Sequence, residues 1–417
     1  MVKYQGYKRY KDSGVKWLGE IPKHWDIWKV THGFKNVGSG TTPKSDNSTF
    51  YDGDIPWITT SELREILIED TTQKVTQEAL KNYSALKVYP KGSIAIAMYG
   101  ATIGRLGILG IDATVNQACC VFSDSKIFHL PFFYYWLWMH RPNLIALSAG
   151  GGQPNLSQDD LKQLRLPTPP IDEQQGIARF LDYKTKQIDD LITKKETLIE
   201  KLDEKRTALI SHAVTKGLDP NVPMKDSGVE WLGEIPKHWE VIRIKRAFIL
   251  QRGVDIRQED QTEGVVPVVS SGGIASYHNV AYAKSPGVLV GRKGTLGSVH
   301  YVEVDYWPHD TTLWVFEFYD NNPRFIYYKL LSMNLKDWDT GSANPTLNRN
   351  LIHPLKIPWT SSEEQGSIVK YLDNKTSEIE QQKAKIQQAI ELLKEYRTAL
   401  ITNAVTGKID VRQVPIP

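Results

Sequence analysis

Apolar and long-stemmed side chains recur at alternating steps of four and three residues in two stretches of the chain. The first stretch contains Ile177, Leu181, Lys184, Ile188, Leu191, Lys195, Leu198, Leu202, Lys205 and Leu209. The second contains Ile368, Leu372, Lys375, Ile379, Gln382, Ile386, Ala389, Leu393, Tyr396 and Leu400. This heptad spacing, without proline or glycine after the first turn, predicts two long α-helices. Each would contain about 40 residues and extend about 60 Å.

Neither predicted helix is stable alone, because a single narrow apolar stripe buries little surface. The lysines of the stripe can lay their stems over the seam and keep their charges in water. Two interpretations fit the pattern: the helices pair within one chain, or they form a coiled coil between two chains. We favour pairing within one chain, because two seams of equal length are present in it.

Short β-branched runs separated by glycine predict strands in the regions outside the helices. These runs lie at residues 54–59, 92–100, 106–110 and 118–122 of the first half and at residues 266–273, 287–294, 298–302 and 312–316 of the second. Two apolar stretches, residues 127–138 and 322–333, are shorter than the roughly 20 residues of a membrane span and predict packed helices. The fold class is therefore mixed α/β.

One segment occurs twice: residues 11–25 (KDSGVKWLGEIPKHW) and 225–239 (KDSGVEWLGEIPKHW) are identical at fourteen of fifteen positions. The helical stretches also align without a gap from Glu173 and from Glu364 onward. This pattern indicates a tandem duplication of a domain-plus-helix unit. The apolar residues of each repeated segment predict that it packs where a long helix ends, in a closed arrangement with pseudo-two-fold symmetry.

The duplication divides the chain into six predicted parts. They are a repeat segment at residues 1–30, a first divergent domain at 31–171, a central long helix at 172–219, a second repeat segment at 220–244, a second divergent domain at 245–362 and a C-terminal long helix with tail at 363–417. Nearly identical flanks around two divergent domains suggest two modules that do the same job on different targets.

Composition limits the chemistry. A net charge of +3 permits nucleic-acid binding without arguing for it. The only cysteines, Cys119 and Cys120, are adjacent and form no disulfide framework, so a reducing cytosol is the simplest compartment. We interpret them as buried strand residues rather than nucleophiles. We likewise interpret His24 and His238 as hydrogen-bonded structural residues rather than metal ligands.

The sequence contains no recognisable catalytic constellation. It lacks the G-x-x-x-x-G-K-[ST] phosphate loop, so we do not expect ATP hydrolysis by this chain, and it lacks the dinucleotide-binding G-x-G-x-x-G. Residues 168–171, TPPI, lack the polar first and aromatic last residue of the tetrapeptide with which amino-methyltransferases hold a target adenine. We therefore predict no catalytic residue and no metal site.

Polar loops at matched places in the two halves carry the candidate binding residues. Such loops are usually only solvated, but their side chains can contact phosphates and base edges, and their recurrence favours a DNA ligand. The candidates are Thr41, Thr42, Lys44, Tyr99, Thr102, Arg105, Gln153 and Asn155 in the first half and Arg292, Lys293, Thr295, Asn344, Thr346, Asn348 and Arg349 in the second.

Together these motifs resemble the specificity subunits of type I restriction-modification systems, over essentially the whole chain. The resemblance rests on the repeated segment, on SGTTPK (residues 39–44) followed by GDIPWIT (53–59), on QPNL and PTLN with a downstream EQ (173–174 and 364–365), and on RTALI and AVT near each helix end. The second half departs from this pattern, because it lacks SGTTPK and IPWIT.

The resemblance implies two target-recognition domains separated by two long antiparallel coiled-coil helices. Each domain would read one half of a bipartite site on double-stranded DNA, and the helix pair would set the spacing. The chain would be cytoplasmic, non-catalytic and without its own cofactor. Two modification subunits would bind S-adenosylmethionine and methylate adenine at N6, and restriction subunits, where present, would use ATP and Mg.

Two other classes of function stay open at this stage. The chain could be a scaffolding adaptor whose two divergent domains bind different proteins. It could also be an enzyme with an unrecognised site near Cys119 and Cys120 or at residues 291–295. Sequence-selective adenine methylation by the chain with a modification partner would favour the first hypothesis, and turnover by the isolated chain would favour the last.

Overall fold

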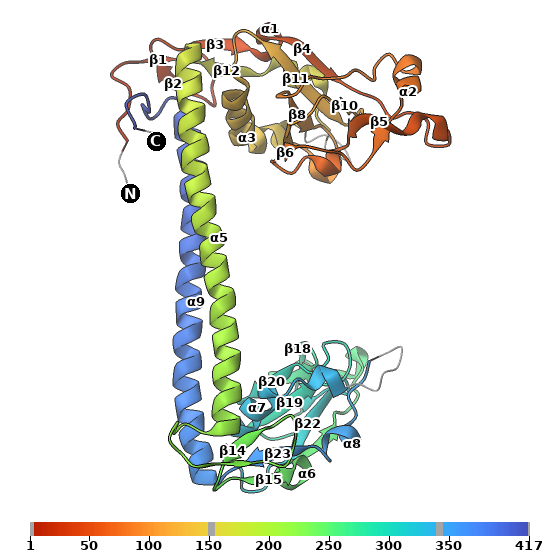
Figure 1. Cartoon of the computed structure of the whole chain (residues 1–417), viewed down its shortest axis with the longest axis vertical. Coiled ribbons are helices and arrows are strands. Elements are labelled where there is room, and N and C mark those ends of the chain that lie inside the picture. Colours follow the sequence, from red (N-terminus) through yellow and green to blue (C-terminus); the bar gives the residue numbers. More distant parts are fainter. Residues whose placement is uncertain (1–3, 149–154, 339–344, 416–417) are drawn as a thin grey trace. The chain divides into compact units, whose positions relative to one another are not determined.

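The computed structural model describes residues 4–148, 155–338 and 345–415 of the chain (Figure 1). The backbone divides into two compact units: unit 1 comprises Met1–Thr193 and Ala389–Pro417, and unit 2 comprises Lys194–Gln388. Each unit contains one divergent domain, one repeated segment and parts of both long helices, α5 (Ile171–Lys216) and α9 (Ser362–Val405). Among the described helices, none is long and apolar enough to cross a lipid bilayer.

The domain of unit 1 is built on a five-stranded sheet with the order β4-β11-β8-β9-β6 and a three-stranded sheet with the order β10-β5-β7. Helix α3 covers one face of the larger sheet, where the ring of Phe133 packs 4.8 Å from that of Phe34 and 5.0 Å from that of Phe122. The remaining elements of unit 1 are β1 (Tyr10–Asp12), β2 (Glu20–Pro22), β3 (Asp26–Lys29), α1 (Val30–Gly33), β4 (Phe34–Ser39), β5 (Tyr51–Ile58), β6 (Leu67–Ile68), β7 (Lys74–Val75), α2 (Gln77–Asn82), β8 (Ile94–Ala97), β9 (Leu106–Leu109), β10 (Thr114–Val115), β11 (Cys119–Ser125), α3 (Leu130–Leu147), α4 (Gln158–Gln163) and β12 (Arg165–Thr168).

The domain of unit 2 repeats this plan with a four-stranded sheet, β16-β22-β19-β20, and a three-stranded sheet, β18-β17-β21. In both small sheets the central strand has one parallel and one antiparallel neighbour. The elements of unit 2 are β13 (Met224–Asp226), β14 (Glu234–Pro236), β15 (Glu240–Arg243), α6 (Ile244–Ala247), β16 (Ile249–Arg252), β17 (Val266–Ser270), β18 (Gly273–His278), β19 (Gly287–Gly291), β20 (Val299–Val302), β21 (Trp307–Pro308), β22 (Thr312–Glu317), α7 (Pro323–Ser332), α8 (Arg349–Ile352) and β23 (Lys356–Trp359). The two divergent domains therefore share a fold, as the sequence predicts.

The local predictions from periodicity are confirmed for the described elements. Every predicted β-branched run overlaps a strand, and the two apolar stretches lead into α3 and α7. Cys119 and Cys120 lie in β11 and are fully buried. Short 3-10 helices complete the chain: Ser48–Phe50, Thr60–Glu62, Gly100–Thr102, Gln258–Asp260 and Leu335–Trp338.

In unit 1, a carboxylate at the start of α5 holds the repeated segment. Glu173 accepts hydrogen bonds from the Trp25 indole (3.1 Å) and the Tyr7 hydroxyl (2.6 Å), and its other oxygen lies 2.8 Å from Nε2 of His24. Trp25 is fully buried. The interpretation of His24 as a hydrogen-bonded structural residue is therefore confirmed.

The first turn of α9 repeats this arrangement in unit 2. Oε2 of Glu364 accepts a hydrogen bond from the Trp239 indole (3.0 Å), lies 2.9 Å from Nε2 of His238 and also receives the Thr360 hydroxyl. Burial alone would raise the pKa of Glu364, but the hydrogen bonds from Thr360, His238 and Trp239 lower it below its usual value. His238, like His24, thus has a structural role.

The glutamine that follows each glutamate holds the divergent domain. Oε1 of Gln174 accepts the backbone N–H of His129, just before α3 (2.8 Å), and Oε1 of Gln365 accepts that of Asn322, just before α7 (2.9 Å). The EQ dipeptide of each helix therefore contacts both its repeated segment and the residue just before the helix that packs on the sheet of its divergent domain.

The repeated segment of unit 1 packs at the end of α9, as predicted. Gly407, which ends the helix with a φ of +71°, contacts Pro22 and Trp25 so closely that an added Cβ would lie 2.4 Å from Pro22. Beyond it, the Asp410 N–H donates to the carbonyl of Gln5 (2.8 Å), so the two terminal segments lie side by side (Figure 1). In unit 2, the equivalent segment packs beside Gly217 at the end of α5.

The buried stripe of the long helices has the predicted spacing, but its phase differs at alternate positions. Leu191 and Leu198, both predicted in the seam, are 42% and 48% exposed, whereas Ile192 and Ile199 are half-buried. In α9, Ile390 is buried, although the heptad pattern predicts its neighbour Ala389 in the seam. Where two adjacent residues are both apolar, the period alone cannot determine which one faces inward.

Ion pairs join α5 and α9 within each unit. They are Arg206–Glu380 (3.5 Å) and Lys383–Asp203 (2.6 Å) in unit 2 and Arg397–Asp189 (3.0 Å) in unit 1. In unit 2, Arg206 follows Asp203 by three residues in α5, whereas its partner Glu380 precedes Lys383 by three residues in α9. The two helices therefore run antiparallel there. Arg206 and Arg397 are the first residues of the two RTALI motifs, which gives this motif a structural role.

We predict that Gly407→Ala destabilises unit 1 by roughly 2–4 kcal/mol, because the new methyl group collides with Pro22 and the backbone keeps a left-handed conformation. Denaturant titration of the purified chain checks this. Gly19→Ala is the matched control, since Gly19 has a φ of +66° and no atom within 4 Å of an added Cβ. It should cost only about 1–2 kcal/mol, and equal effects of the two substitutions would contradict the docking contact.

We predict that Glu364→Gln lowers the free energy of unfolding at neutral pH by roughly 1–3 kcal/mol, because the hydrogen bonds to its charged oxygen weaken. The folded-state pKa of Glu364 is lowered, so its stabilisation is present above the usual value of 4.5 and is lost as the pH falls through the lowered value. The difference between wild type and variant should shrink below about pH 4.5. Glu363→Gln, an exposed neighbour in the same turn, is the control; a variant effect that persists unchanged in acid would refute the assignment.

Candidate nucleic-acid interface

The loops that carry the predicted residues of unit 1 meet at one edge of the larger sheet. Strands β4 and β8 end at this edge, and β11, which pairs with both, begins there. Beyond the strands, the N–H of Gly40 donates to the carbonyl of Asn116 (3.3 Å), and that of Met98 donates to the carbonyl of Ala118 (2.8 Å). Three loops distant in sequence are thereby held together by their backbones.

The loop after β4 contributes Thr41, Thr42 and Lys44 to this edge. The carbonyl of Thr41 accepts a hydrogen bond from the indole of Trp57 (3.3 Å), and the hydroxyl of Thr42 donates to the side chain of Gln117. The side chains of Thr42 and Lys44 are exposed. The backbone of the loop is therefore fixed while its polar side chains stay available to a ligand.

The loop after β8 contributes Tyr99, Thr102 and Arg105. Tyr99 forms an antiparallel bridge with Asn155, and the Thr102 hydroxyl donates to the carbonyl of Tyr99 (3.2 Å). The structure thus brings these three residues and Asn155 into one small region. Another candidate, Gln153, lies outside the described residues.

The same edge recurs in unit 2 with the same backbone hydrogen bonds. Arg292, which follows β19, donates its N–H to the carbonyl of Thr311 (2.7 Å) and accepts the N–H of Leu347 on its own carbonyl (3.0 Å). In unit 1, the carbonyl of Met98 accepts the equivalent bond from Leu156 (2.9 Å). The backbone frame is therefore shared, but a methionine in one unit corresponds to an arginine in the other.

A cavity of about 230 Å³ lies at this edge of unit 2. Its lining consists of four predicted residues, Arg292, Thr346, Asn348 and Arg349, together with Arg252, Leu313 and Leu347. Three guanidinium groups around so small a space suit a ligand with hydrogen-bond acceptors or negative charge, such as a base edge or a phosphate.

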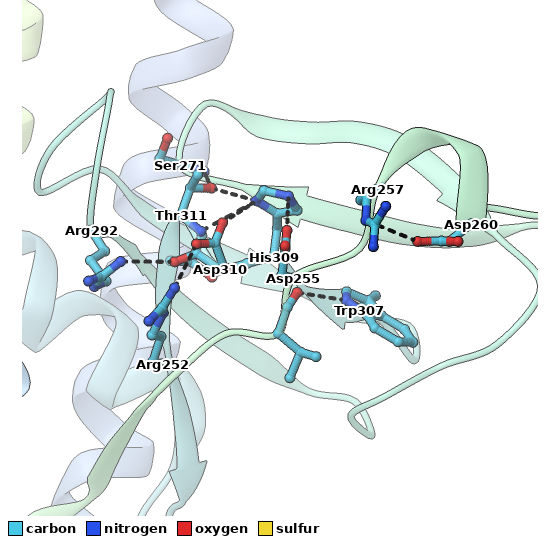
Figure 2. Close-up of polar contacts among 12 residues, drawn as sticks. Arg252, Asp255, Arg257, Asp260, Ser271, Arg292, Trp307, His309, Asp310 and Thr311 are labelled. Atoms are coloured by element: carbon cyan, nitrogen blue, oxygen red, sulfur yellow. Dashed lines mark hydrogen bonds and ion pairs between the residues drawn. The ribbon is translucent and has the colours of Figure 1, made fainter.

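Asp310 organises two of these arginines. Its carboxylate accepts a hydrogen bond from Nη2 of Arg252 (2.9 Å), and its backbone carbonyl accepts one from Nη1 of Arg292 (3.3 Å), so both side chains converge on it (Figure 2). Burial lowers the pKa of the Arg292 guanidinium, and the charge of Arg252 lowers it further. Positive charge is therefore concentrated here beyond what Asp310 neutralises.

Asp255, His309 and Asp310 approach one another within 4.8 Å, a spacing that could hold a metal ion. In the structure, Nδ1 of His309 lies 3.3 Å from the backbone nitrogen of Thr311 and 3.3 Å from Oδ1 of Asp310, Nε2 lies 4.0 Å from Asp255, and the other oxygen of Asp310 accepts the hydrogen bond from Arg252 (Figure 2). The cluster thus serves to position Asp310.

Two other predicted residues of unit 2, Lys293 and Thr295, are not part of the cavity lining. Lys293 and Thr295 are exposed in the turn between β19 and β20, and Asn344 lies outside the described residues. Sequence reasoning missed Gln117, Arg252 and Asp310. The sequence contained one signal for Arg252: Gly253 follows it directly at a strand end, just as Gly40 directly follows β4 in unit 1.

The geometry around the cysteines opposes an enzymatic site there. Burial raises the pKa of the Cys120 thiol to about 12, and burial likewise raises that of Cys119. Both thiols lie inside the sheet, where a substrate cannot reach them. A thiolate nucleophile at these positions is therefore disfavoured.

Comparison with known proteins identifies the family. Residues 22–201 and 236–392 match the model of the type I restriction modification DNA specificity domain. The chain is 30% identical over 269 residues to the type I restriction enzyme MjaIX specificity subunit of Methanocaldococcus jannaschii, a match that covers 62% of this chain and 59% of that relative. It is 21% identical over 439 residues to the MjaVIII specificity subunit of the same organism, with coverage of 97% and 98%.

Solved structures share the fold. A chain solved in work on complex assembly and conformational transition of the type I R-M system superposes with a TM-score of 0.74 at 12% identity, over 92% of this chain and 98% of that one. The HsdS subunit from Thermoanaerobacter tengcongensis gives a TM-score of 0.56 at 15% identity, with coverage of 93% and 98%.

Two tandem α/β domains with matched, divergent polar edges define a class of tandem two-domain protein. Within that class, the chain belongs to the family of type I restriction-modification DNA specificity subunits. The resemblance drawn from the repeated motifs is thereby confirmed.

Proposed function

We propose that this chain is the DNA-binding specificity subunit of a type I restriction-modification complex. Each recognition domain, residues 31–171 and 245–362, would read one half of a bipartite site. The observation that carries the proposal is the single sheet edge that recurs in both units with different side chains. One backbone frame carries the exposed side chains of Thr42 and Tyr99 in unit 1 and of Arg252 and Arg349 in unit 2, which suits two readers of different base sequences.

The pair α5 and α9 would set the spacing between the two half-sites in a pseudo-two-fold arrangement. Half-sites read from one face of DNA lie about 34–36 Å apart or at multiples of this distance. A continuous helix is stiff, and the ion pairs from Arg206 and Arg397 fix its register against the partner helix. A flexible linker would leave the distance undefined.

The two repeated segments would present matching surfaces to two identical modification subunits. Within these otherwise packed segments, Trp17 and Trp231 are 42% and 54% exposed, and exposed aromatic residues are common anchors in protein interfaces. The modification subunits would supply S-adenosylmethionine and methylate adenine at N6, and restriction subunits, where present, would add ATP and Mg. The predicted part boundaries and cytoplasmic location belong to this proposal.

If the chain were instead a scaffolding adaptor, its divergent domains would need a different kind of exposed surface. Protein-binding inserts would expose large apolar patches, whereas the edge of unit 2 gathers Arg252, Arg292 and Arg349 around a small polar cavity. Arginine is the residue most often used to contact both DNA phosphates and guanine. This cavity therefore favours DNA over a protein ligand.

Expression of the chain with its modification subunit should give adenine methylation at one bipartite sequence, detected by methylome sequencing. Replacing residues 245–362 with the equivalent domain of another family member should change one half-site and leave the other intact. The unexchanged chain is the control. No sequence-selective methylation would refute the proposed function, and a change in both half-sites would refute separate reading by the two domains.

Insertion of one heptad into α5 and one into α9 should lengthen the unspecified gap of the site by up to about three base pairs, because seven helical residues add about 10 Å. The same methylome readout measures the gap. A chain lengthened in α5 alone is the control, since unequal helices break the cross-helix ion pairs and should lower its stability. An unchanged gap in the doubly lengthened chain would mean that the helices do not set the spacing.

A further inference from the structure

Arg252 is held differently from the other basic side chains at the edge of unit 2. It is the last residue of β16, its Nη2 lies 2.9 Å from Oδ2 of Asp310, and its side chain is 57% exposed. Asp310 is only 20% exposed and lies 3.3 Å from the ring of His309. The guanidinium therefore extends toward solvent from a rigid strand, with one edge fixed by a half-buried carboxylate.

This arrangement suits a base edge better than a phosphate. A phosphate contact works through net charge, which displaces counterions from DNA, and Asp310 cancels much of the charge of Arg252. Reading a base edge depends instead on the direction of the donors, and the planar fork of arginine offers several N–H groups in fixed geometry. The carboxylate occupies one side of the fork and leaves the rest oriented outward.

The neighbouring basic residues have the opposite character. Arg349 and Lys293 are exposed, and no carboxylate within the described parts of the chain forms an ion pair with either. Their full charge and free orientation suit phosphate contacts, which need no exact direction. The edge of unit 2 thus contains two kinds of basic side chain: one is paired with a carboxylate, and the other forms no ion pair within the described parts of the chain.

We propose that Arg252 is a specificity-determining residue that recognises a guanine in the half-site read by the second domain, and that Asp310 is the positioning residue that orients it. The inference rests on the proposed function of the chain. Arginine pairs with O6 and N7 of guanine through two parallel hydrogen bonds, and no other base offers two acceptors there in the major groove. Arg292, held on the backbone carbonyl of Asp310, borders the same cavity.

The test uses the chain in complex with its modification subunits and a library of DNA duplexes with randomised bases, from which bound sequences are selected and read. The wild-type complex should select a bipartite site with a guanine in the second half. Arg252→Lys keeps the charge but loses the planar fork. It should reduce discrimination at that one position by roughly 5- to 150-fold and leave the salt dependence of binding unchanged.

Asp310→Asn should relax the same position and no other, because it removes the charge that orients Arg252 without changing the shape of the side chain. Arg257→Lys is the matched control: Arg257 is also exposed and carboxylate-paired, 2.9 Å from Glu259, but lies outside the cavity. It should select the wild-type site. Thermal unfolding of each variant verifies that the fold is intact.

The outcomes distinguish a failure of this inference from a failure of the proposed function on which it rests. A wild-type complex that selects no sequence refutes the proposed function and the inference with it. A wild-type complex that selects a site while Arg252→Lys selects the same site refutes the inference alone. If Arg252→Ala instead weakens binding equally at all sequences and lowers the slope of affinity against salt by about one, Arg252 contacts a phosphate and the guanine assignment is wrong.

Discussion

A carboxylate in the first turn of each long helix joins three parts of the structure that are distant in sequence. Glu173 and Glu364 accept hydrogen bonds from a tryptophan and contact a histidine of the repeated segment, while the next residue, Gln174 or Gln365, binds the backbone that leads into α3 or α7. Glu173 is buried and Glu364 is partly buried, and a carboxylate removed from water is stable only if its oxygens accept hydrogen bonds, so the segment, the helix and the recognition domain must come together correctly. We call this set of contacts the joint of each unit. It orients the sheet edge of the domain relative to the long helix.

The two joints share geometry without sharing every residue. Tyr135 and Tyr328 bond to equivalent aspartates of α5 and α9, but the next residue is Trp136 in one unit and Lys329 in the other. Trp136 is buried among aromatic rings, whereas the buried ammonium of Lys329 donates to the carbonyl of Val214 in the last turn of α5. Burial lowers the pKa of Lys329 to about 7. One side chain fills space and the other satisfies a helix-terminal carbonyl, yet both place the recognition helix similarly.

The sequence was informative where a structural feature is local and less so where it depends on distant partners. Strands and long helices follow from short-range periodicity, and the candidate loops follow from polar, glycine-containing stretches at matched places. The phase of the helix seam was wrong at Leu191 and Leu198, because an equally apolar isoleucine follows each. Arg252 was missed because its orientation depends on Asp310, 58 residues further along the chain, and the sequence near either residue does not indicate that pairing.

The near-identity of the repeated segments and the divergence of the edges have one physical cause. In the joints, side chains such as Trp25 and Glu173 make the essential hydrogen bonds, so a substitution leaves a buried polar group without a partner. At the edges, the backbone makes the bonds that hold the loops together, as between Arg292 and Leu347 or Met98 and Leu156. Almost any side chain is compatible with such a backbone contact. New combinations of charge and hydrogen-bonding groups, including an arginine oriented by an aspartate, can therefore arise at the edge without disturbing the joint that positions it.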